Sequence, residues 1–189
     1  MLKLYITDMR GANELRSKRK GRSPQRGSAF GQSLLEYAVA DTWGIPLPEQ
    51  TPPGGKPRFL DRPDLHFSIS HSKTHVLVAL ADAPVGADVE TRRELSKASA
   101  RMLMDGREEA AFDFFELWCL REGVYKLNGA GKMREVLRFD RVDGRIVGPD
   151  PNVWYELVDG IEGCACAVCM EARFEVPQLI WVEIEKLCT

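Results

Sequence analysis

The stretch that decides the fold is residues 85–90, which reads Val85-Gly86-Ala87-Asp88-Val89-Glu90. Its apolar residues alternate with Asp88 and Glu90, and the side chains of a strand repeat every two residues. We therefore predict a strand that carries both carboxylates on one face. By themselves, two acids on one face also fit the charged edge of an ordinary sheet.

A second stretch, residues 116–126, is typical of a helix. Trp118, Glu122 and Lys126 recur at four-residue spacing and so share one stripe, while leucines and valines form a separate core face. A glutamate four residues before a lysine is also a routine surface pair, but a purely solvated stripe rarely carries Trp. If this stripe faces the strand, three carboxylates and a lysine converge. Clustered oxygen ligands suit Mg²⁺, and Mg²⁺ beside a lysine suits phosphate chemistry.

The composition is that of a globular protein whose 189 residues can bury a core as one large domain or two small halves. The net charge of −2 predicts neither nucleic-acid nor membrane binding. No apolar run reaches transmembrane length, the first residues do not resemble a signal peptide, and the cysteine count is odd. We expect a cytoplasmic protein. Basic residues crowd one early segment, which fits a solvated loop or a contact with an anionic partner: Arg10, Arg16, Lys18, Arg19, Lys20, Arg22 and Arg26.

The order of predicted elements favours an α+β fold of two similar α/β halves, residues 1–83 and 84–189, each reading strand, helix and small meander. The predicted strands are 2–6, 65–70, 76–81, 85–90, 136–140, 145–147, 153–158, 164–171 and 179–185, and the predicted helices are 24–43, 94–104 and 107–128. The run Cys164 to Cys169 fits a buried strand rather than a zinc site.

Two polar segments of the first half are candidate anion sites. Ser70 and His71 end the strand at 65–70, where hydroxyl, imidazole and turn amides fit an anion pocket or an ordinary polar hairpin tip. Gly54-Gly55-Lys56-Pro57 lacks the spacing of a P-loop, yet it presents Lys56 before a rigid turn. The spacing of the three histidines does not favour a metal site.

Taken in order, Gly55-Lys56-Pro57, Ser68-Ile69-Ser70-His71-Ser72, the 85–90 strand and the 118–126 helix resemble the 4′-phosphopantetheinyl transferases, in particular their surfactin-type, single-chain branch. The motifs span residues 54–131. The resemblance implies two α+β halves in pseudo-two-fold relation, with coenzyme A between them.

The resemblance also implies a chemistry. Mg²⁺ would be held by Asp88, Glu90, Glu122 and the pyrophosphate of coenzyme A; the serine of an apo acyl or peptidyl carrier protein would attack the β-phosphorus, and 3′,5′-ADP would leave. Glu122 would take the serine proton, directly or through water, and Lys126 would hold phosphate oxygens. The positions that match coenzyme A contacts are Lys56, Pro57, Ser70, His71, Asp88, Arg121 and Lys126, with Arg26 as the candidate from the basic segment.

Two positions depart from the family pattern: Arg121 stands where lysine is commoner, and Gly123 stands where Ala or Ser is usual and costs about 1 kcal/mol of helix stability. Two other functions stay open, a non-catalytic binder of carrier protein or coenzyme A, and a Mg²⁺-dependent hydrolase of a nucleotide diphosphate. The identity of the carrier (fatty-acid, polyketide or nonribosomal-peptide) and the choice between Mg²⁺ and Mn²⁺ also stay open. We expect a monomer.

Overall fold

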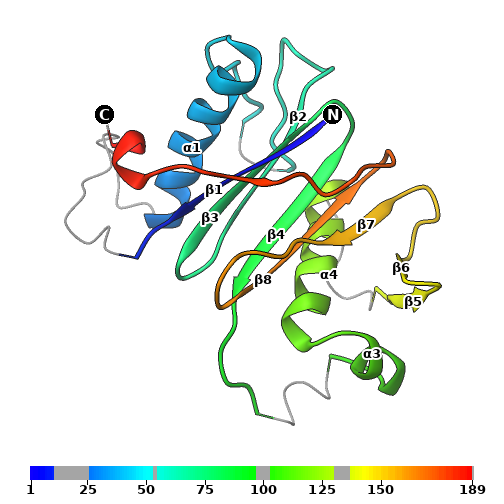
Figure 1. Cartoon of the computed structure of the whole chain (residues 1–189). Helices are drawn as coiled ribbons and strands as arrows, with labels where there is room; N and C mark the ends of the chain where they lie inside the picture. Colours follow the sequence, from blue (N-terminus) through cyan, green and yellow to red (C-terminus); the bar gives the residue numbers. More distant parts are fainter. Residues whose placement is uncertain (11–25, 53–54, 97–102, 130–136, 189) are drawn as a thin grey trace.

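The computed structural model describes residues 1–10, 26–52, 55–96, 103–129 and 137–188. Within these residues the chain forms two β-sheets and a small number of helices (Figure 1). The predicted α+β class is confirmed. No helix in these ranges is both long enough and apolar enough to cross a membrane.

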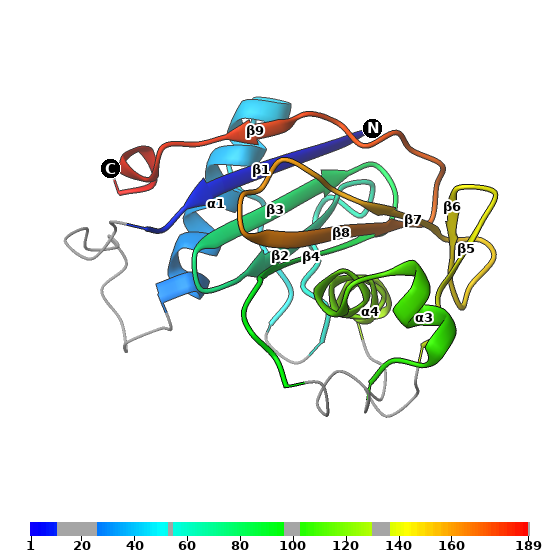
Figure 2. The same cartoon turned by 60° about the horizontal axis from the view of Figure 1, so that its bottom comes forward.

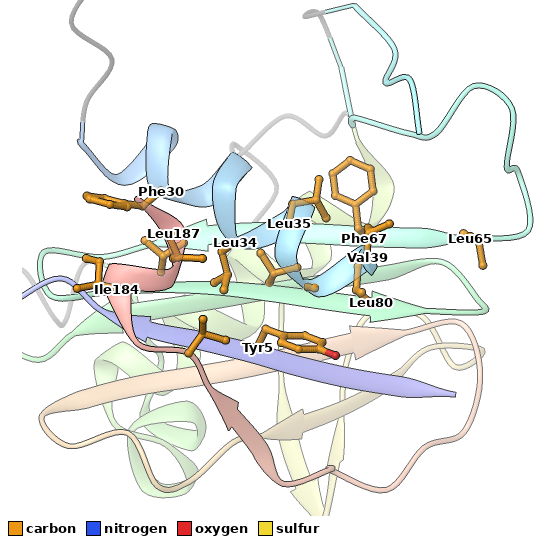
Figure 3. Packing of buried hydrophobic residues seen from close by; sticks show 14 of the residues in the cluster. Tyr5, Phe30, Leu34, Leu35, Val39, Leu65, Phe67, Leu80, Ile184 and Leu187 are labelled. Atoms are coloured by element: carbon orange, nitrogen blue, oxygen red, sulfur yellow. The ribbon is translucent and has the colours of Figure 1, made fainter. Parts of the chain in front are cut away.

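The first sheet has four strands in the order β2-β3-β1-β9, which are His66–His71, His75–Ala81, Leu2–Asp8 and Leu179–Trp181. Helix α1, Arg26–Trp43, covers one face of this sheet (Figure 2). In Figure 3, Phe30 and Leu34 of α1 lie in one apolar cluster with Tyr5, and Leu187 lies beside Phe30 in the same cluster. Leu187 belongs to the 3₁₀ helix η2, Ile184–Leu187, so the end of the chain packs on the first sheet.

The second sheet has five strands in the order β4-β8-β7-β6-β5, which are Val85–Thr91, Cys164–Met170, Trp154–Leu157, Arg145–Val147 and Asp140–Val142. Helix α4, Phe114–Asn128, packs against β4 and β8, and the short helix α3, Gly106–Ala111, precedes it. The turn between β5 and β6 uses positive φ angles at Asp143 (51°) and Gly144 (78°), as a tight hairpin requires.

The two sheets face each other across a shared apolar layer. Leu4, Leu77 and Ala79 of the first sheet meet Ala87 and Val168 of the second in one buried cluster. Strands β3 and β8 are therefore buried along their whole length, which confirms the prediction for the cysteine-rich strand. The layers run α1, first sheet, second sheet, α4 (Figures 1 and 2).

Most predicted elements are present with shifted ends. The single helix predicted over 107–128 is wrong, because the structure interrupts it at Phe112 and Asp113. The Asp113 carboxylate accepts hydrogen bonds from the amides of Phe115 and Glu116, and the Asp113 amide donates to the Glu116 carboxylate. This capping box begins a new helix at Phe114.

The helix predicted over 94–104 is wrong at its described ends, because residues 94–96 and 103–104 are not helical; its middle lies outside the described residues. The strand predicted over 136–140 is reduced to one that starts at Asp140. The strand predicted over 179–185 ends at Trp181, and a 3₁₀ helix follows from Ile184.

Candidate active site

The site is built where edge strand β2 of the first sheet lies beside edge strand β4 of the second. The Oγ atom of Ser68 accepts a hydrogen bond from the Ala87 amide at 3.0 Å, and that of Ser70 accepts one from the Val89 amide at 3.2 Å. Two serine hydroxyls thus satisfy backbone donors on the edge of β4 that faces away from β8. We call this junction the β2–β4 contact.

Asp88 lies at the centre of the site and is 4% exposed. Its Oδ1 atom accepts a hydrogen bond from Ser70 Oγ at 2.5 Å and one from Lys126 Nζ at 2.6 Å. Its Oδ2 atom is buried and has no hydrogen-bond partner among the described residues. Three elements, β2, β4 and α4, therefore determine the surroundings of one carboxylate.

Helix α4 reaches Asp88 because its backbone lies directly against β4. A Cβ atom added at Gly86 would overlap the Gly123 carbonyl and lie 2.5 Å from the Leu127 nitrogen. A Cβ atom at Gly123 would lie 2.9 Å from Cys169 Sγ. The glycine that departs from the family pattern thus lies where the helix approaches the sheet closely, and an added Cβ atom there would press on a side-chain sulfur.

The two remaining acids share the electrostatic environment of Asp88. Burial, followed by the charge of Asp88, raises the pKa of Glu122, and Lys126 opposes the rise. Burial, then the charge of Asp88, also raises the pKa of Glu90, while Arg93 and Lys126 act in the opposite direction. The stripe of α4 thus faces the acidic strand, as the sequence predicts.

The carboxylate oxygens of Asp88, Glu90 and Glu122 are ligands of the kind that a hard divalent cation prefers, and their negative charge suits such an ion. One of these oxygens, Asp88 Oδ2, is buried and receives no hydrogen bond within the described ranges. The side chains as they stand do not form a ready-made metal centre: within the part of the chain that the structure describes, no group of three or more His, Cys, Asp or Glu is arranged to hold an ion. Instead, Lys126 Nζ forms an ion pair with Asp88 Oδ1.

Lys56 contacts the C-terminal end of α4. Its Nζ atom donates to the carbonyls of Val85 and Leu127, both at 2.9 Å. Burial, with a smaller contribution from Arg58, lowers the pKa of Lys56 to about 8. The ammonium group therefore satisfies a carbonyl of the last helical turn, where a cation is favoured, and ties the 55–57 loop to the second half. Pro57 is exposed beside it.

Arg121 is bound to protein groups rather than free. Its Nη2 atom lies 2.9 and 3.1 Å from the carboxylate oxygens of Glu108, and its Nε donates to the Leu137 carbonyl at 3.0 Å. The Leu103 carbonyl accepts from Nη1. Glu108 is 1% exposed. The sequence analysis missed this buried acid, although Asp105 and Glu108 have the spacing of a capping box.

The structure shows fewer contacts for the remaining candidate residues. His71 is half-buried at the end of β2, next to Ser70. Arg26 is the first residue of α1, but its side chain lies outside the described part, as do the basic residues from 16 to 22. Trp118 stacks on Phe114 with ring centroids 6.0 Å apart, which explains a Trp on this stripe without any ligand.

Known proteins resemble this chain in sequence. It is 30% identical to the 4′-phosphopantetheinyl transferase psf-1 of Bacillus pumilus over 56% of this chain and 51% of that protein. It is 30% identical to a 4′-phosphopantetheinyl transferase of Bacillus subtilis over 71% of this chain and 64% of that protein. The chain belongs to the 4′-phosphopantetheinyl transferase superfamily.

A third member of the superfamily, the 4′-phosphopantetheinyl transferase ffp of Bacillus subtilis, is 32% identical over 66% of this chain and 62% of its own length. No protein-family model matches the chain. This superfamily member spans about half to two thirds of the length of these relatives. The family resemblance inferred from the ordered motifs is confirmed.

Proposed function

We propose that this chain transfers the 4′-phosphopantetheine group of coenzyme A to a serine of an apo acyl or peptidyl carrier protein and releases 3′,5′-ADP. The relatives named as 4′-phosphopantetheinyl transferases support the reaction class. The observation that carries the proposal is Asp88, which is buried between Ser70 and Lys126, and whose Oδ2 receives no hydrogen bond from the residues that the structure describes. A site of this kind, with two further acids beside it, suits a cation and an anionic diphosphate.

We also propose that the halves 1–83 and 84–189 are related by a pseudo-two-fold axis, with coenzyme A between them. The strand orders support this proposal: β2-β3-β1 in the first sheet corresponds to β7-β8-β4 in the second, with antiparallel neighbours in both. In each half, a helix follows the strand that comes first in the chain, which is β1 or β4. An antiparallel pair of strands comes later in the chain, β2 and β3 in the first half and β7 and β8 in the second. Strand β9 departs from the scheme, because it returns from the second half to pair with β1.

Asp88, Glu90 and Glu122 would hold Mg²⁺ or Mn²⁺. When bound, such an ion neutralises charge on the diphosphate and on the departing phosphate oxygen. Side chains of this protein would carry out the proton transfer and bind the phosphate groups. Glu122 would accept the proton of the carrier serine, directly or through water.

Lys126 would hold phosphate oxygens. Its ammonium group has three N–H donors, of which Asp88 takes one, so two can face the diphosphate. Lys56 keeps one N–H after its two carbonyl contacts, and His71 stands beside the β2–β4 contact. The contacts of Lys56, Pro57, Ser70, His71, Arg121 and Arg26 with coenzyme A remain proposals from the family pattern.

The experiment is mass spectrometry of apo carrier proteins incubated with this protein, coenzyme A and Mg²⁺. We expect a carrier to gain the mass of phosphopantetheine, and Asp88→Asn to abolish the gain while the protein stays folded. A panel of fatty-acid, polyketide and nonribosomal-peptide carriers identifies the partner class. Consumption of coenzyme A without a mass gain would point to a hydrolase, and binding with neither change would point to a non-catalytic homologue.

A further inference from the structure

We infer that Ser70 is a positioning residue that holds the carboxylate of Asp88 so that Oδ2, rather than Oδ1, is left to a cation. This inference rests on the proposed function, because it concerns the same site. It differs from the role that the family pattern gives to this serine, which is contact with coenzyme A phosphate.

The first argument is the orientation of the Ser70 hydroxyl, which has one proton to donate and is 3% exposed. The Val89 amide donates to Ser70 Oγ at 3.2 Å and so occupies the acceptor side of that oxygen. The proton is therefore directed to Asp88 Oδ1, at 2.5 Å. A hydroxyl with a fixed amide on one side and a carboxylate on the other cannot donate to a phosphate without releasing Asp88.

The second argument is the unequal treatment of the two Asp88 oxygens. Ser70 Oγ and Lys126 Nζ both contact Oδ1, while Oδ2 is buried and no described residue donates a hydrogen bond to it. Leaving one buried carboxylate oxygen unpaired is unfavourable, and a carboxyl free to rotate about its χ2 angle would share the two donors between both oxygens. Donors from two different elements, β2 and α4, prevent this exchange.

Ser68 provides a matched control. It lies two residues before Ser70 on the same face of β2, is 5% exposed, and accepts a hydrogen bond from the Ala87 amide at 3.0 Å. Ser68→Ala therefore removes one hydroxyl from the β2–β4 contact, as Ser70→Ala does, without touching a carboxylate. Any difference between the two variants reports on Asp88 and not on the packing of the strands.

The experiment measures Mn²⁺ binding by electron paramagnetic resonance, with coenzyme A present, for wild type, Ser68→Ala and Ser70→Ala. We expect Ser70→Ala to weaken Mn²⁺ binding about tenfold, as removal of a group that orients a metal ligand does, and Ser68→Ala to change it less than about twofold. In the transfer assay, Ser70→Ala should raise the Mg²⁺ concentration that gives half-maximal rate.

Three results would overturn the inference: equal Mn²⁺ affinity for the two variants, no Mn²⁺ binding by wild type, or a Ser70→Ala defect confined to the KM for coenzyme A. If Ser70→Ala does not fold, Ser70→Cys keeps the volume with a weaker donor and carries the same comparison. Failure of the proposed function gives a different pattern, in which no carrier gains mass while Mn²⁺ binding still depends on Ser70.

Discussion

The close contact between β4 and α4 makes Gly86→Ala the sharpest test of how the site is assembled. A Cβ atom at Gly86 would lie 2.5 Å from the Leu127 nitrogen and overlap the Gly123 carbonyl, and both neighbours are backbone atoms that cannot rotate away. Restoring an ordinary contact of about 3.5 Å requires the strand and helix to separate by about 1 Å. The contact between Lys126 Nζ and Asp88 Oδ1, now 2.6 Å, would then exceed hydrogen-bond distance.

Overpacking of this kind costs about 1–3 kcal/mol, so Gly86→Ala should lower the free energy of unfolding by that amount in urea denaturation. The transfer rate per folded molecule should fall further, by tenfold or more, because Lys126 no longer contacts Asp88. Gly123→Ala is the control: its Cβ would meet a side-chain sulfur, Cys169 Sγ, and alanine favours a helix over glycine by about 1 kcal/mol. A Gly86→Ala protein as stable and active as Gly123→Ala would refute the reasoning.

Three further outcomes follow from the charged groups. Glu108→Leu should lower the free energy of unfolding by about 3 kcal/mol in urea, because Arg121 would lose its buried carboxylate; a loss below about 1 kcal/mol would contradict this. Arg121→Lys should lower the free energy of unfolding by about 1–2 kcal/mol, because lysine lacks the planar group that meets both oxygens of Glu108, and an unchanged free energy of unfolding would contradict this. For Lys56, the folded-state pKa of about 8 lies below the ordinary 10.5, so the unfolded chain binds more protons between these values and the contribution of Lys56 to stability rises with pH. Because Lys56 is partly exposed and solvent screens its charge, the difference in unfolding free energy between wild type and Lys56→Met should increase by only about 1 kcal/mol from pH 8 to pH 10, and a flat difference would show that Lys56 titrates normally.

Local periodicity explains which parts of the site could be predicted. The alternation of Asp88 and Glu90 and the four-residue spacing of Glu122 and Lys126 determine which face each side chain occupies, and these faces depend only on strand and helix geometry. The break between α3 and α4 was predictable too. Asp113 is followed three residues later by Glu116, which is the spacing of a capping box.

Other features depend on contacts between distant segments and could not be predicted. Gly123 counted only as a weak helix former until the structure placed Cys169 against it. Lys56 and Arg121 have long side chains whose partners, the Leu127 carbonyl and Glu108, are set by tertiary packing. A basic residue in a motif predicts an anionic neighbour, but the pattern does not distinguish a phosphate from a carboxylate or a helix-end carbonyl.

The position of Asp88 connects the chemistry to the assembly of the fold. Its carboxylate is held by β2 from the first sheet and by α4 from the second half, while β4 carries its backbone. The serine hydroxyls of β2 satisfy β4 amides without extending the sheet, so the two sheets remain separate layers joined through side chains. Any change in how the sheets dock must therefore alter the donors on Asp88 Oδ1. The same contacts that join the two sheets thus determine whether the acidic cluster can receive a cation.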